Sequence, residues 1–266
     1  MAERPSDVTM VGRQVGWEQK LFWRNPAAAG FSVLFPLLFL VIFSLTSNDS
    51  KIDIGHHLQV KGIQYYAAGL LVFGLISVSC TSLAINLTFR RDDGLLKRKR
   101  GTPLPAWGFV AGLIGSSMIV GVVLTAAVVA FARLAYGLTV PTTRLPTLVL
   151  VLLIGTLAFC AIGILMTAAI PNADAAPAIV NIAVFPLIFL SGVFFPVQNE
   201  VLNRVADLFP IRHFIGALDT VFATPIGHQA AGIGSMPWAD LAVIAAWGIV
   251  AAALASRWFR WEPAVT

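Results

Sequence analysis

The sequence predicts an all-α membrane protein with six transmembrane helices and with both termini in the cytoplasm. The chain is 58% hydrophobic and only 12% charged, whereas soluble domains carry about 45–50% apolar and about 25% charged residues. Six apolar runs reach the length of roughly 20 residues that a transmembrane helix needs. Lys and Arg residues also gather in the segments that would share one side of the membrane.

The apolar runs follow one another along a single transmembrane domain, residues 1–266. We expect transmembrane helices at residues 27–46, 67–88, 107–134, 148–170, 178–195 and 241–259. The third run is longer than a bilayer requires, so its helix should be tilted or should extend beyond the membrane.

The distribution of basic residues predicts the orientation. Twelve of the 18 Lys and Arg residues lie in the N-terminal segment, the loop after the second run and the C-terminus. By the positive-inside rule these segments are cytoplasmic. The abundance of Arg and Ala hints at a GC-rich bacterial genome, so we expect a multi-pass protein of the bacterial plasma (inner) membrane.

A helix is expected before the first span, within residues 1–26. Ser6 or Asp7 can cap its start, and Asn25-Pro26 ends it. One side of this helix is basic and aromatic, which suits the cytoplasmic membrane surface, although an ordinary solvated helix is the alternative. The residues of this interface helix are Arg13, Trp17, Lys20 and Arg24.

The loop at residues 89–106 holds the most charged stretch of the chain. Gly94 and Pro103 bracket a short helical segment with acids near its N-terminus and basic residues toward its C-terminus, which the helix dipole favours. A simple topology signal would need only the basic residues, so we expect an element that docks on another protein. Its residues are Asp92, Asp93, Gly94, Leu95, Leu96, Lys97, Arg98, Lys99 and Arg100.

The second and fifth apolar runs carry polar side chains together with aromatic ones. Such a surface could line the path of an amphipathic molecule, although small hydroxyl side chains also hold helices together in lipid. The candidate path residues are Ser77, Ser79, Thr81, Ser82, Asn86, Asn181, Phe185 and Phe189.

Residues 196–238 are expected to form an extracellular helical hairpin that dips back into the outer leaflet. An apolar helix face formed by Val201, Leu202, Val205 and Leu208 is followed by a break at Phe209-Pro210. The acids in this segment argue against a full span, because each costs about 2–3 kcal/mol at the middle of a membrane.

Several kinds of chemistry are missing. No Lys follows a Gly, so the phosphate-binding G-x-x-x-x-G-K-[ST] loop is absent and the chain is not expected to hydrolyse ATP. The six runs contain no Asp or Glu in their interiors, which argues against an ion-coupled carrier. No metal-binding or catalytic arrangement stands out, and no cofactor or nucleic acid is expected.

Two stretches resemble the permeases of ABC-2-type transporters. These are "RRDDGLLKRKRGTPLPAWGFVAG" in the charged loop and "LSGVFFPVQNEVLNRVADLFPIRHFIGAL" after the fifth run. The sequence is similar to the drug- and antibiotic-exporter branch, since it is compact. It departs from the family pattern at Lys99, where an apolar residue is usual, and at Asp219, where a basic residue is frequent.

The resemblance implies a permease subunit that moves a hydrophobic or amphipathic substrate outward, such as a drug, an antibiotic or a lipid-like molecule. It implies two copies of a separate ATP-binding subunit, which binds ATP and Mg, and a second permease in a homodimer or with a sister permease. The short helix would seat in the ATPase, with the N-terminal helix beside it. A permease for a lipid-linked glycan, and a membrane anchor or assembly subunit that transports nothing, are the alternatives.

Overall fold

The structure, a computed structural model, describes residues 7–47, 51–53, 59–101, 105–223 and 236–259. Five helical stretches in this part of the chain are long and apolar enough to cross a membrane. They lie within α2 (Pro26–Ser47), the run formed by α3 (Gly62–Ile76) and α4 (Leu83–Asp92), α6 (Ala106–Tyr136), α7 (Leu145–Ala169) and α11 (Trp238–Trp258). The structure therefore confirms a helical membrane protein.

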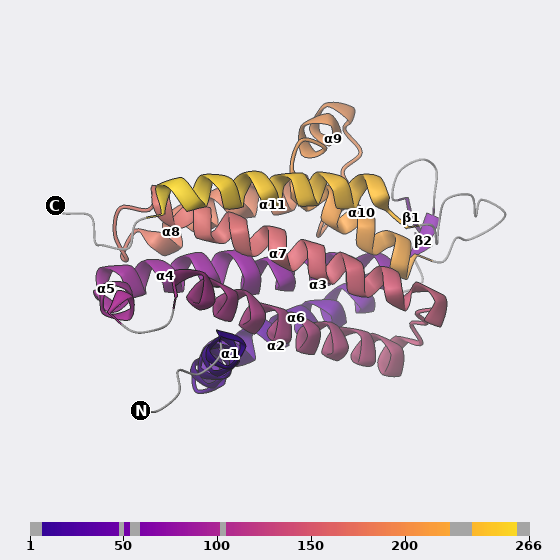
Figure 1. Ribbon diagram of the computed structural model, residues 1–266. Coiled ribbons are helices and arrows are strands. Elements are labelled where there is room, and N and C mark those ends of the chain that lie inside the picture. Colours follow the sequence, from indigo (N-terminus) through magenta and orange to yellow (C-terminus); the bar gives the residue numbers. More distant parts are fainter. Residues whose placement is uncertain (1–6, 48–50, 54–58, 102–104, 224–235, 260–266) are drawn as a thin grey trace.

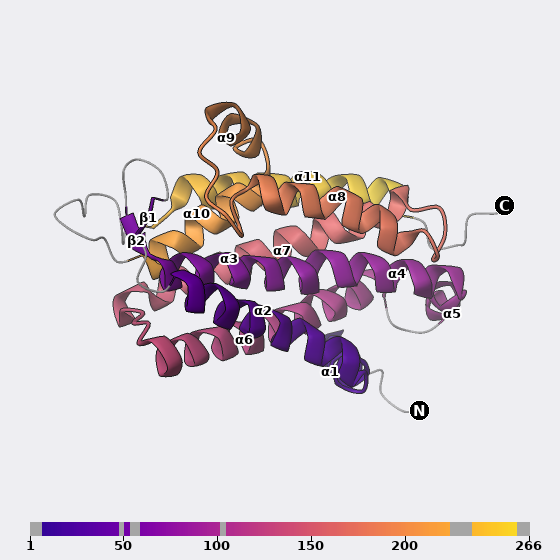
Figure 2. The same cartoon turned by 180° about the vertical axis from the view of Figure 1, so that it is seen from behind.

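The long helices form a bundle in which α7 lies against α11, α6 and α4 (Figures 1 and 2). The helix α1 (Asp7–Trp23) crosses the bundle at a steep angle on its α6 side. The short helix α5 (Leu95–Arg100) and the C-terminal end of α11 lie at one end of the bundle (Figure 1). Two of the three basic segments expected in the cytoplasm, the loop after the second span and the C-terminal segment, thus share one end.

The second span is longer than expected, because the helical run is continuous from Gly62 to Asp92. A π-helical segment, Ser77–Ser82, joins α3 to α4 and contains four of the candidate path residues, Ser77, Ser79, Thr81 and Ser82, whereas Asn86 lies in α4. The Ser77 and Ser79 hydroxyls donate hydrogen bonds to the carbonyls of Phe73 and Leu75 at 2.8 and 2.6 Å. Wide helical turns of this kind often lie next to functional sites.

The fifth run differs from expectation. The helix α8 (Ala176–Leu190) ends five residues before the predicted boundary, at a turn where Gly192 adopts a φ of 77°. Its 15 residues extend about 22 Å, which is short of the roughly 30 Å hydrocarbon core. The expected six long spans are therefore five long helices and one short apolar helix in the described residues.

Two of the segments that join spans at the other end of the bundle contain regular structure, of which only the strand pair was not predicted from the sequence. The first holds a small antiparallel pair, β1 (Lys51–Asp53) with β2 (Gln59–Lys61). The second holds α9 (Glu200–Ala206), whose Val201, Leu202 and Val205 side chains are exposed, and α10 (Pro210–Phe222). The helix α10 packs inside the protein against α3, α7 and α11, so the hairpin does not dip into lipid as one unit. Residues 224–235 of the predicted hairpin lie outside the described part.

Candidate functional site

The helix α5 is anchored to the bundle while most of its described surface is open. Gly94, with a φ of 69°, turns the chain between α4 and α5, and its carbonyl accepts a hydrogen bond from Arg98 N at 3.2 Å. Leu96 is buried in a cluster with residues of α4, α6 and α7. Leu95, Lys97 and Arg98 are exposed. The helix thus presents a partly basic surface at the end of the bundle.

The two acids before α5 are placed differently from the expectation that they would stabilise its N-terminus. Asp92 is the last residue of α4. Its carboxylate accepts hydrogen bonds from Ala173 N at 2.6 Å and from the Arg91 Nε at 3.1 Å. Asp93 is exposed and forms the C-cap of α4. Asp92 therefore connects α4 to the link between α7 and α8.

Arg91 is buried and binds the C-terminal end of α7. Its guanidinium donates hydrogen bonds to the carbonyl oxygens of Thr167 and Ile170, both at 2.9 Å, and of Pro171 at 3.3 Å. These carbonyls have no partner within the helix, and a positive charge favours the helix C-terminus. The sequence analysis counted Arg91 only among the basic residues that indicate the orientation in the membrane.

Arg90 connects α4 to α1. Its guanidinium donates two hydrogen bonds to the Glu18 carboxylate, with Nη1–Oε1 at 2.8 Å and Nη2–Oε2 at 2.7 Å. Glu18 is only 5% exposed and also accepts a hydrogen bond from Gln14 Nε2 at 2.6 Å. Arg90, Arg91 and Asp92, which we call the α4 junction, therefore bind three separate parts of the protein.

The helix α1 packs on α6 through residues that the sequence analysis did not select. A Cβ atom at Gly112 would lie 2.9 Å from the Gln14 Cβ, and one at Gly115 would lie 2.9 Å from a Val15 methyl. Gln19 Nε2 donates to the Ser116 carbonyl and hydroxyl at 2.8 and 2.9 Å. The predicted interface residues are all exposed: Arg13, Trp17, Lys20 and Arg24. Small residues in α6 thus allow the polar side of α1 to approach closely.

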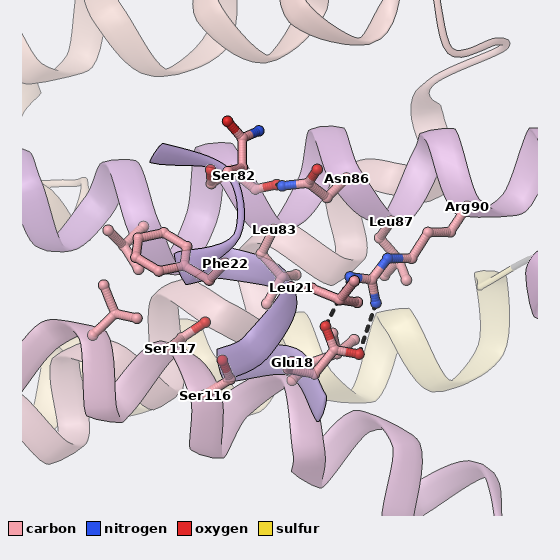
Figure 3. A pocket seen from close by; sticks show the side chains of 14 residues that line it. Glu18, Leu21, Phe22, Ser82, Leu83, Asn86, Leu87, Arg90, Ser116 and Ser117 are labelled. Atoms are coloured by element: carbon pink, nitrogen blue, oxygen red, sulfur yellow. Dashed lines mark hydrogen bonds and ion pairs between the residues drawn. The ribbon is translucent and has the colours of Figure 1, made fainter. Parts of the chain in front are cut away.

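A cavity of about 160 Å³ lies between α1, α6 and the second span. In Figure 3, Glu18 of α1 and Arg90 of α4 face each other at one side of the cavity, with Ser82 and Asn86 on the same span as Arg90. Ser116 and Ser117 line it from α6, and Leu21 and Phe22 from α1. The cavity therefore combines an ion pair, hydroxyl groups and apolar surface.

The sequence matches the family model "ABC-2 type transporter" over residues 15–222. The chain belongs to the ABC-2 type transporter family. A comparison with curated proteins finds none that matches it. The protein is thus the membrane domain of an ABC transporter, a permease and not a nucleotide-binding domain. Family membership implies an ABC ATP-binding partner.

The candidate path residues of this ABC-2 permease do not gather at one place. Ser82 and Asn86 line the cavity, whereas the Ser77 and Ser79 hydroxyls bind backbone carbonyls within their own helix. Thr81 is partly exposed in the π-helical segment.

The remaining path residues lie on α8, which packs beside α4 and the π-helical segment. Phe185 and Phe189 are 41% and 53% exposed, and Asn181 is half-buried. The Phe185 ring lies 6.4 Å from that of Phe73, between centroids. The permease thus carries an aromatic surface on α8 that is separate from the residues lining the cavity.

A second polar cluster of the permease lies around α10. The His213 Nδ1 is 2.8 Å from Asp240 Oδ1, and the His213 Nε2 is 2.9 Å from the Asp207 carbonyl. Arg212 donates a hydrogen bond to the Ser191 carbonyl at 3.3 Å. Burial raises the pKa of the Asp219 carboxyl to about 7, although Arg212 opposes this shift. This cluster ties α10 to α11 and to the turn after α8.

Proposed function

We propose that this permease is the membrane half of an exporter that moves a hydrophobic or amphipathic substrate outward. Two copies of a separate ATP-binding subunit, which hold ATP and Mg²⁺, supply the energy, and a second permease completes the transporter. The single observation that carries the proposal is the attachment of α5 to the α4 junction. Because α5 is anchored at its base and open on its surface, it is suited to receive force from a partner.

The surface of α5 favours an acidic partner. Lys97 and Arg98 are exposed beside Leu95, which is 42% exposed. A partner cleft with carboxylates around an apolar centre would complement this surface in charge and in hydrophobicity. We expect such a cleft on the ATP-binding subunit.

The α4 junction offers a route from α5 to the spans. Movement of α5 displaces the end of α4, because only Asp93 and Gly94 separate the two helices. Arg90 passes this displacement to α1, while Arg91 and Asp92 pass it to α7 and to the link before α8. We expect the substrate and the second permease to contact the exposed aromatic residues of α8.

The test is to solubilise the tagged protein gently from its native membrane and to identify the proteins that remain bound. We expect a Walker-motif ATPase in a 1:1 ratio with the permease. The variant Gly94→Pro should lose most of the bound ATPase, since the proline ring cannot adopt the φ of 69° at this position.

Gly137→Pro is the matched control. Gly137 has the same φ of 69° and the same open surroundings as Gly94, but it ends α6 at the other end of the bundle. This variant should retain the ATPase. A wild-type preparation without an ATPase after crosslinking, or equal retention in both variants, would overturn the proposal.

A further inference from the structure

The cavity between α1, α6 and the second span has polar groups that the protein leaves unpaired. Asn86 Nδ2 donates to the Ser82 carbonyl at 2.8 Å. In the described part of the chain, no group hydrogen-bonds to the Ser82 hydroxyl or to the Asn86 Oδ1. Both residues line the cavity (Figure 3). Asn86 is exposed and Ser82 is half-buried, so an occupant of the cavity can reach both groups and form hydrogen bonds with them.

The other polar groups of the cavity are already engaged. Glu18 and Arg90 neutralise each other through two hydrogen bonds. The Ser116 hydroxyl accepts a hydrogen bond from Gln19. The cavity therefore has no uncompensated charge among its charged residues, and Ser82 and Asn86 offer a hydroxyl and an acceptor. This pattern selects a neutral ligand with a hydrogen-bond donor over an ion.

The remaining lining is apolar and the space is small. The apolar lining residues from the second span and α6 are Val78, Leu83, Leu87, Leu113 and Val120. The volume of about 160 Å³ is close to that of a cavity of about 150 Å³ that accepts benzene in another protein. The space thus suits one ring or a short chain.

We propose that this cavity binds a neutral amphipathic molecule of single-ring size, with a hydroxyl or amide donor directed at Ser82 and Asn86. The site is separate from the aromatic surface of α8, and it does not depend on the export proposal. A bound molecule would contact α1 and α4 on both sides of the Glu18–Arg90 ion pair.

The experiment uses the full-length protein in nanodiscs of phosphatidylcholine and phosphatidylglycerol. The probe is a propylphenol that carries a photoreactive diazirine, and adducts are mapped by mass spectrometry. We expect saturable labelling of the segments that line the cavity. Ser82→Phe fills the space and should weaken labelling by tenfold or more, on the order of 1.4 kcal/mol. Asn86→Leu removes the acceptor at similar size and should weaken it by about fivefold.

Three controls make the result specific. Ser256→Phe introduces the same ring on an exposed position of α11 and should leave labelling unchanged. A probe of the same shape without the hydroxyl, and one with a quaternary ammonium in its place, should both label weakly. Three results would overturn the proposal. These are labelling that does not saturate, equal labelling by the probe without the hydroxyl, and labelling that persists in both Ser82→Phe and Asn86→Leu.

Discussion

Glu18 of α1 and Arg90 of α4 are 72 positions apart in the chain, yet they form an ion pair with two hydrogen bonds of 2.8 and 2.7 Å. The next two residues, Arg91 and Asp92, bind the C-terminal end of α7 and the link to α8. Three consecutive residues thus fix the end of the second span immediately before α5. Under the proposed function, a displacement of α5 would reach several helices, because close-packed interiors transmit strain.

Removing the charge of Glu18 should loosen α1. Glu18→Gln leaves the partly buried Arg90 without its counter-charge, so we expect a loss of about 1–3 kcal/mol. The readout is the thermal unfolding midpoint of the purified protein, together with the rate of proteolysis within α1. Glu200→Gln is the control, because its 4.0 Å pair with Arg204 is exposed on both sides and should contribute little. Equal effects of the two variants would contradict this account of Glu18.

Replacing Arg91 should be more harmful. Arg91→Ala leaves three carbonyls at the end of α7 without their donor, at a cost of about 3 kcal/mol. Arg91→Lys should recover only part of this stability, because an ammonium group lacks the planar fork of guanidinium. Unfolding midpoints measure both variants, with the exposed Arg133→Ala as control. Full recovery by lysine would show that charge alone matters here.

Gly69 of α3 packs against the turn after α8, so position 69 should not tolerate a side chain. An added Cβ would collide with the carbonyl oxygen of Val193, which is backbone and cannot rotate away. Gly69→Ala should therefore destabilise the protein by about 2 kcal/mol or more and lower the yield of folded protein. Gly12→Ala adds its methyl group to open space on α1 and should stabilise the helix by about 0.5–1 kcal/mol. Similar yields for both variants would refute the close approach of Val193.

The pKa of Asp219 predicts a pH dependence of stability. Burial raises it from 3.8 to about 7, so between these values the folded protein keeps a proton that the unfolded chain releases. The contribution of the Asp219 carboxyl to the free energy of unfolding therefore falls as the pH rises from about 4 to about 7. Asp219→Asn should flatten this part of the profile, whereas the more exposed Asp207→Asn should not. Unfolding midpoints at several pH values test this, and identical profiles would exclude the shift.

Much of the fold could be predicted from the sequence, because apolar runs and basic loops reflect the bilayer directly. The limits of α2, α6, α7 and α11 lie within about three residues of the expected spans. The early end of α8 could not be predicted, since "FLSGVFF" remains apolar through a turn that only Gly192 signals. Burial of α10 was also missed, because it depends on tertiary contacts such as Phe214 with Phe159.

The site was predicted less completely than the fold. The sequence indicated α5 through its charges and glycine, but it assigned Arg90 and Arg91 only to topology. Their partners are Glu18 and backbone carbonyls of α7, which lie more than 70 positions away. Glu18 is an isolated acid on a basic helix, and this departure from the pattern of α1 was the signal available for the ion pair.

The central claim, that α5 receives an ATP-binding subunit, is tested most directly by site-specific photocrosslinking in native membranes. A photoreactive amino acid replaces the exposed Arg98 of α5 or, as control, the exposed Arg133 at the other end of the bundle. The account predicts that position 98 crosslinks to a Walker-motif ATPase and that position 133 does not. Absence of this product from position 98, or equal amounts from both positions, would contradict the account.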